Sequence, residues 1–286
     1  MNTTLHARLL LALTLIAGCR EAPTTKPSAT TPTAVARPGS GRAAAGAEGD
    51  QLVQFSLLAA LAAGDYGGGA PLARMLEFGD FGVGTFDGLD GEMIVLDGAV
   101  YQVLADGEVV QRTDEGATPF ATVTFFDADG TLTEVAAASL QDLDQSLDRR
   151  LPHAKRPYAL RVSAEFAELT LRSAPPQSPP YRPLAEVIDQ QRVWTRENVR
   201  GTLIGIRCPA WMGTLNVAGY HWHFLSDDRT IGGHVLDCRF AGGRLTYDEC
   251  SSVLIELPGS ASFGAVDMSG VSDADVDKIE RQRSGR

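Results

Sequence analysis

From residue 50 onward, apolar and polar residues alternate mostly with the two-residue period of a half-buried β-strand. Asp-Gly pairs separate three such runs over 92–111, and because Asp-Gly tolerates the positive φ of tight hairpin turns, these runs predict a meander. A further hairpin is predicted around Asp129-Gly130, between strands at 120–126 and 131–135. More strands are expected downstream, at 158–172, 199–206, 219–225, 234–240 and 245–257.

Helical spacing occupies shorter segments. Apolar residues recur three or four positions apart over 52–62, which predicts one helix. Ser139 is a typical N-cap for a second helix, whose leucines form a single stripe. A short helix is expected near 184–188, and Ser272 with Asp275 resembles the capping box of a last helix.

This mixture predicts an α+β fold of mixed and mainly antiparallel β-sheets with a few helices. The folded domain is expected to cover residues 49–286. We expect two sheet-based subdomains in it, at about 49–165 and 166–286.

The first 48 residues have a different character. Arg8 precedes an apolar run too short to span a bilayer, and small residues then lead to Cys19, as in a secretory signal peptide over residues 1–18. The order Ile-Ala-Gly-Cys at 16–19 resembles the bacterial lipoprotein box, in which the cysteine is lipidated. The alternative is an ordinary cleaved signal in which Cys19 has no role.

Residues 19–48 are expected to be a lipidated cysteine followed by a flexible spacer, because positions 20–48 are rich in Pro, Thr and Ala and lack Leu, Ile and aromatic residues. The sequence thus predicts an exported protein, lipid-anchored to a bacterial cell-envelope membrane, with its folded domain outside the cytoplasm. Lipidated Cys19 is its only expected membrane contact. Which membrane carries the anchor stays open.

Composition narrows the function classes. The chain has 286 residues, 44% of them hydrophobic, and can bury a substantial core. Its 36 Asp and Glu residues outnumber 25 Lys and Arg residues, and the net charge of -11 disfavours nucleic-acid binding. Four cysteines are too few for a disulfide scaffold, and the sequence leaves the pairing of Cys208, Cys238 and Cys250 open.

Candidate chemistry is concentrated at residues 219–236, which hold three of the five histidines. His221 and His223 lie two apart, so in a strand both rings point to one face. The chain between them and His234 is long enough to turn, so a hairpin can bring His234 beside the other two. Three neutral imidazoles suit a first-row metal, with Zn²⁺ the first choice, and leave at least one coordination position for water or substrate.

Other kinds of site compete with this hypothesis. A closed structural zinc site needs a fourth ligand, for which Cys238 is the nearest thiol, but in a strand it lies roughly 13 Å from His234 at about 3.3 Å per residue. A cupin-type oxygenase site needs a carboxylate soon after the histidine pair, where only Asp227 and Asp228 occur. A metallohydrolase is disfavoured because neither His-Glu-x-x-His nor Gly-x-Ser-x-Gly is present.

Several spaced motifs add to the histidine segment. They are GDFGVGTFDGLDGEM at 79–93, TPFATVTFF at 118–126, RSAPPQSPPYRPL at 172–184, GYHWHFLSDDR at 219–229 and GGHVLD at 232–237. In this combination the chain resembles the α-acetolactate decarboxylase family over about residues 50–282. Ile206 departs from the family pattern, which favours an aromatic there.

The resemblance implies a carboxy-lyase of acetoin biosynthesis that converts 2-acetolactate to acetoin and CO₂ with zinc, and without thiamine or pyridoxal. It places the zinc ligands at His221, His223 and His234. It places further catalytic residues at Glu92, Arg172 and Glu280, of which Glu280 has the weakest motif. It also suggests a homodimer, which no sequence feature measures.

These residue types suit the reaction. Loss of CO₂ from this β-keto acid leaves an enediolate, whose charge a zinc ion stabilises as a Lewis acid. Arg172 would orient an anionic substrate group, and Glu92 or Glu280 would deliver the proton, a choice that also decides product stereochemistry. Without the resemblance, Arg172 would be interpreted as a surface cation, Glu92 as a hairpin-edge carboxylate and Glu280 as a solvated helix residue. The rival hypothesis is a non-catalytic metal-binding envelope lipoprotein.

Overall fold

The computed structural model describes residues 50–113, 115–272, 275–276 and 278–279. The predicted signal peptide, Cys19 and the predicted spacer lie outside these residues, as does Glu280. Among the described residues, no helix has both the length and the apolar character needed to cross a membrane.

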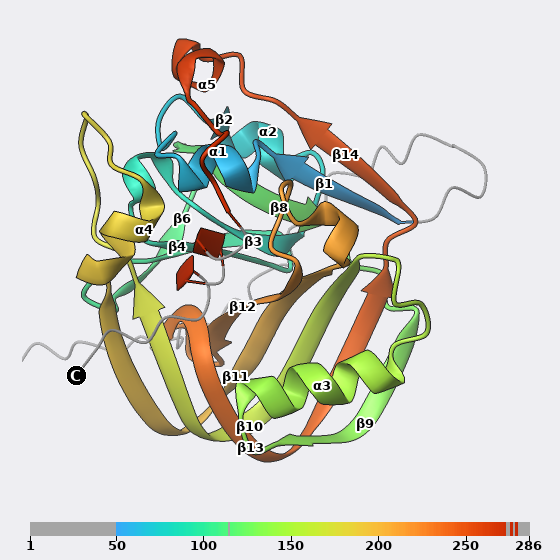
Figure 1. Cartoon of the computed structure of the whole chain (residues 1–286). Coiled ribbons are helices and arrows are strands. Elements are labelled where there is room, and N and C mark those ends of the chain that lie inside the picture. The colour runs from blue at the N-terminus through green and yellow to red at the C-terminus, as the bar shows by residue number, and fades with distance from the viewer. Residues whose placement is uncertain (1–49, 114, 273–274, 277, 280–286) are drawn as a thin grey trace, which may run out of the picture. The chain divides into compact units, whose positions relative to one another are not determined.

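Two large β-sheets dominate the described chain, with short helices around them, which confirms the predicted α+β class (Figure 1). The first sheet has seven strands in the order β14-β1-β8-β3-β4-β5-β6, and all its pairings are antiparallel except β1–β14. Its strands are β1 (Gln51–Phe55), β3 (Phe81–Thr85), β4 (Glu92–Leu96), β5 (Ala99–Val103), β6 (Val109–Arg112), β8 (Phe120–Thr124) and β14 (Ser252–Glu256).

The second sheet has five strands, in the order β10-β11-β12-β13-β9. Because β10 also pairs with β13, strands β10 to β13 close into a ring. The strands are β9 (Gly130–Ala137), β10 (Tyr158–Ser173), β11 (Arg192–Cys208), β12 (Gly219–Ser226) and β13 (Gly232–Glu249). A separate two-stranded ribbon joins β2 (Ala70–Pro71) to β7 (Ala117–Thr118).

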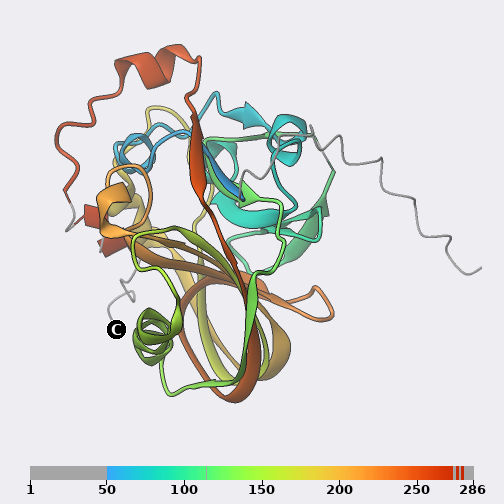
Figure 2. The ribbon, with the colours of Figure 1, turned by 90° about the vertical axis from the view of Figure 1, so that its right-hand side faces the viewer.

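The helices are short apart from α3, which spans Leu140–Arg150. Ser139 caps it by accepting a hydrogen bond from the Asp142 backbone N–H at 3.2 Å, as predicted, while Leu143 and Leu147 pack into the core of the second sheet. Figure 2 shows α3 end-on beside the curved strands. The remaining helical segments are α1 (Leu58–Ala62), α2 (Leu72–Leu76), α4 (Leu184–Val187), α5 (Ala261–Ala265) and three 3₁₀ turns, η1 (Asp87–Leu89), η2 (Ile188–Gln190) and η3 (Ala210–Met212).

The structure corrects two sequence predictions. The helix expected over 52–62 begins only at Leu58, because 51–55 forms β1 between β14 and β8. Residues 52–55 of β1 are all buried, including the polar Gln54, so this strand lacks the alternation of apolar and polar residues that marks a half-buried strand. The hairpin expected around Asp129-Gly130 is also wrong. Strands β8 and β9 belong to different sheets, and the segment 125–129 that joins them crosses from one sheet to the other.

The two sheets pack against each other through a shared apolar core. Side chains of β3, β4 and β5 meet Ile204 and Ile206 of β11 and Leu225 of β12 there. The proposed subdomain division near residue 165 stays a prediction; β10 runs through that position, and β14 joins the sheet of the first half. This packing places β4 beside β12, which sets the position of the candidate site.

Candidate active site

The three histidines of the 219–236 segment meet at the β12–β13 hairpin. His223 and His234 are direct cross-strand partners, and His221 lies two residues before His223 on the same face of β12. The ring centroids are 4.8 to 5.4 Å apart, and one nitrogen of each ring lies within 4.8 Å of the others. The hairpin predicted from the spacing therefore forms, and it brings the three rings together.

Burial keeps the imidazoles of His221 and His223 neutral. It lowers the pKa of His221 to about 3, with a further contribution from the Arg172 cation. Burial, with repulsion from His221 and Arg172, also keeps the pKa of His223 well below its usual range. Neutral imidazole is the form that binds a metal.

A main-chain group fixes the tautomer of His223. Its Nδ1 lies 2.8 Å from the carbonyl oxygen of Met93 in β4. Because a carbonyl can only accept, Nδ1 carries the proton and Nε2 presents its lone pair. Nε2 is also the atom that lies 3.1 Å from Nε2 of His221, so the lone pair faces the other rings.

Glu92 and Arg172 adjoin this cluster from the two sheets. Arg172 of β10 is the cross-strand partner of His234, and Glu92 is the first residue of β4. Arg172 Nη1 donates to Glu92 Oε1 at 3.2 Å, while Glu92 Oε2 lies 3.5 Å from Nε2 of His223. The two residues are only 5% and 7% exposed, so they are neither a surface cation nor an exposed hairpin-edge carboxylate.

The C-terminal segment also contributes to the site. Arg172 Nη2 donates to the carbonyl oxygen of Ile279 at 3.1 Å, and Ile279 lines the same pocket as His221 and His234. The pocket walls are otherwise largely apolar, with side chains from α1, η1, β8 and α4 that include Leu58, Leu61, Leu89, Phe120 and Leu184. The polar groups therefore converge at one end of a hydrophobic pocket, the common form of a small-molecule site.

The donor set fits one first-row divalent cation. Three neutral nitrogen ligands are typical of catalytic zinc sites, which keep a further position open. Cys208, Cys238 and Cys250 are buried free thiols, and none belongs to the histidine cluster of the described chain. Within the described residues, the structure thus gives no thiolate that would close the site.

Sequence reasoning missed the two backbone carbonyls and the apolar wall. Any residue type supplies a carbonyl, so Met93 and Ile279 carry no signal at all. The leucines of α1 and α4 are indistinguishable in sequence from ordinary core residues. Only the tertiary packing of the folded chain brings these carbonyls and leucines close to the histidines.

Comparisons with known proteins agree on one family. The sequence model of the family described as alpha-acetolactate decarboxylase matches residues 52–270. The chain is 42% identical over 232 residues to alpha-acetolactate decarboxylase of Methanosarcina mazei, covering 81% of each chain. It is 41% identical to the Klebsiella aerogenes protein of that name, over 74% of this chain and 82% of the relative.

The fold agrees with the sequence. The crystal structure of alpha-acetolactate decarboxylase from Bacillus subtilis strain 168 superimposes with a TM-score of 0.79 at 32% identity. The match covers 81% of this chain and 100% of that structure.

Proposed function

The chain belongs to the α-acetolactate decarboxylase family, and from that premise we propose that it converts 2-acetolactate to acetoin and CO₂ with a bound Zn²⁺. One observation carries the proposal. Three buried histidines lie together beside an Arg–Glu ion pair at a largely apolar pocket, and this combination suits a reaction in which negative charge develops on a small anionic substrate.

His221, His223 and His234 would hold the cation. When bound, Zn²⁺ supplies a Lewis acid that stabilises the negative charge developing on the substrate oxygens. The Met93 carbonyl supports this arrangement, because it holds the ring of His223 in the tautomer whose Nε2 can act as a ligand.

Arg172 would bind and orient the substrate. Its two terminal nitrogens already donate to Glu92 and to the Ile279 carbonyl, which fixes the guanidinium plane. Its buried Nε has no hydrogen-bond acceptor among the described residues. An anionic oxygen of the substrate could take this donor in a charge-assisted hydrogen bond.

Glu92 would supply the proton. The bond between the carboxyl group and the hydroxyl-bearing carbon breaks, CO₂ leaves, and the electron pair moves into the neighbouring ketone to give an enediolate. The carbon that lost CO₂ then takes a proton from the Glu92 carboxyl, giving acetoin, and water restores the proton to Glu92. Glu92 is positioned for this task, because its Oε2 lies 3.5 Å from Nε2 of His223 and its side chain lines the same pocket.

Glu280 remains the second candidate donor and lies outside the described residues. The residue before it in the sequence, Ile279, lines the pocket. Separate Glu92→Gln and Glu280→Gln variants would distinguish the two, since only loss of the donor removes the protonation step.

The purified full-length protein tests the proposal directly. With racemic 2-acetolactate it should form acetoin and CO₂ in equal amounts, after subtraction of an enzyme-free control. A protein that binds zinc but forms no acetoin above that control would instead support a non-catalytic metal-binding role.

We also propose that the enzyme is exported and lipid-anchored through Cys19. The support is the order of basic start, short apolar run and small residues before this cysteine. Metabolic labelling with a fatty-acid probe should mark the wild-type chain and not Cys19→Ala. Labelling that survives the substitution would exclude Cys19 as the lipidated residue.

A further inference from the structure

Three aspartates converge away from the active site. Asp50 directly precedes β1, Asp129 directly precedes β9 and Asp248 is the penultimate residue of β13. One carboxylate oxygen of each lies within 4.8 Å of the other two. We propose that this group, the aspartate cluster, is a Ca²⁺ site that joins the two sheets.

The strongest support comes from Asp248, which is 0% exposed. Its Oδ2 accepts the backbone N–H of Asp127 at 3.3 Å, but its Oδ1 is buried and has no hydrogen-bond partner among the described residues. A buried carboxylate oxygen without a partner is costly, because its hydration is lost and nothing replaces it. A cation among the three carboxylates would satisfy this oxygen.

The charges around Asp248 point the same way. Neither Asp129 nor Asp248 forms an ion pair with a basic side chain in the described part of the chain. Within the described residues, Asp129 and Asp248 are thus held together with no protein cation paired to either of them.

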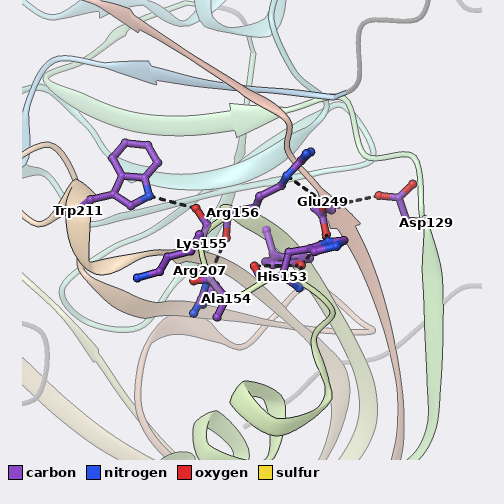
Figure 3. A network of polar contacts seen from close by, with 9 residues as sticks. Asp129, His153, Ala154, Lys155, Arg156, Arg207, Trp211 and Glu249 are labelled. Atoms are coloured by element: carbon purple, nitrogen blue, oxygen red, sulfur yellow. Dashed lines mark hydrogen bonds and ion pairs between the residues drawn. The ribbon is translucent and has the colours of Figure 1, made fainter.

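The neighbouring carboxylate of Glu249, in contrast, has side-chain partners for both of its oxygens. Glu249 Oε2 lies 2.6 Å from Nδ1 of His153, and Glu249 Oε1 lies 3.3 Å from Nε of Arg156 (Figure 3). The backbone N–H of Glu249 donates to Asp129 Oδ2 at 2.8 Å, which holds Asp129 beside β13. The described chain therefore supplies a cationic partner, Arg156, to Glu249 while leaving the adjacent Asp248 without one.

The ligand type suits calcium. All three ligands are carboxylate oxygens, which suit hard cations rather than zinc. Calcium–oxygen bonds measure about 2.3–2.6 Å, so three oxygens that all lie within 4.8 Å of one another can surround one Ca²⁺ ion.

The test uses the full-length protein with its other metal retained. Equilibrium dialysis against ⁴⁵CaCl₂ should find one calcium ion per chain. Thermal unfolding should shift upward by about 5–10 °C when CaCl₂ is in hundredfold excess over its dissociation constant, and less with MgCl₂. Asp129→Asn and Asp248→Asn should each abolish binding and the shift, while the matched charge change Asp227→Asn in an exposed turn should leave both intact.

Two results would overturn the proposal: no calcium bound by the wild type at millimolar CaCl₂, or binding that survives both cluster variants. Asp129→Asn keeps a side-chain oxygen that can accept a hydrogen bond from the Glu249 N–H, so this variant should fold. If Asp248→Asn fails to fold, calcium binding by Asp129→Asn alone tests the proposal. Acetoin formation is not part of the readout, so the outcome is independent of the proposed decarboxylase activity.

Discussion

Replacing Glu92 with glutamine should slow the reaction far more than it disturbs the protein. The Glu92→Gln side chain keeps its length and an oxygen that can accept from Arg172 Nη1, which lies 3.2 Å from the native carboxylate, but it cannot donate a carboxylic proton. Loss of a positioned acid typically costs about 10²–10⁴-fold in rate, which corresponds to about 3–5 kcal/mol of transition-state stabilisation. A drop in kcat of that size is expected.

The same substitution has a separate cost in stability. Removing one partner of a buried ion pair destabilises by about 3–5 kcal/mol when the other charge is left without any partner. Because glutamine retains the hydrogen bond to Arg172, we expect a smaller loss of about 1–3 kcal/mol in the free energy of unfolding. The variant should therefore stay folded at assay temperature.

The assay measures initial rates of acetoin formation together with metal content and thermal unfolding. Glu165→Gln, at an exposed position of β10, is the matched control and should retain wild-type kcat. Undiminished kcat in a folded, metal-loaded Glu92→Gln protein would refute the role of Glu92 as proton donor. A variant that loses its metal would instead assign Glu92 to holding the site.

Three further predictions address binding, packing and pH. Arg172→Lys should raise KM at least tenfold, because lysine keeps the charge but loses the planar fork, and an unchanged KM would exclude substrate binding by this side chain. Gly205→Ala should lower the free energy of unfolding, measured in urea, by about 1–3 kcal/mol, because the new Cβ would lie 2.3 Å from the Trp222 ring. The control Gly242→Ala, whose Cβ would have no atom within 4 Å, should lower it by less than about 0.5 kcal/mol. Equal effects of the two substitutions would contradict the packing of Trp222 against Gly205. Burial raises the pKa of Asp248 in the folded protein to about 8, above its ordinary value of 3.8. Between about pH 4 and pH 8 the unfolded wild type therefore releases this proton while the folded protein retains it, and the stability of the wild type falls as pH rises. In calcium-free buffer, the Tm of Asp248→Asn should accordingly rise relative to that of the wild type across this window. A Tm difference that does not change with pH would show that Asp248 titrates normally.

Local patterns predicted much of the fold, and the errors have a common cause. The meander over 92–111, α3 and the long β10 follow from turn chemistry, capping and alternation within single segments. The Asp-Gly pair at 129–130 predicts a hairpin turn, but Asp129 lies in a bend and Gly130 is already the first residue of β9. Pairing partners are set by long-range packing, which local patterns do not encode.

The same distinction holds for the site. His221 and His223 could be placed on one face because the strand period fixes their directions, and the glycines before His234 allowed the return. Glu92 and Arg172 come from different sheets and were located through family resemblance alone. No pattern in their own segments indicates that the two residues form a buried ion pair.

The central claim is that a metal held by the three histidines is required for decarboxylation. Dialysis against a strong chelator, followed by stepwise addition of Zn²⁺, tests it with metal content and acetoin formation measured on the same samples. Activity should disappear with the metal and return in proportion to zinc up to one equivalent per histidine cluster, and it should not return in His223→Ala. Full turnover by metal-free protein would contradict the account.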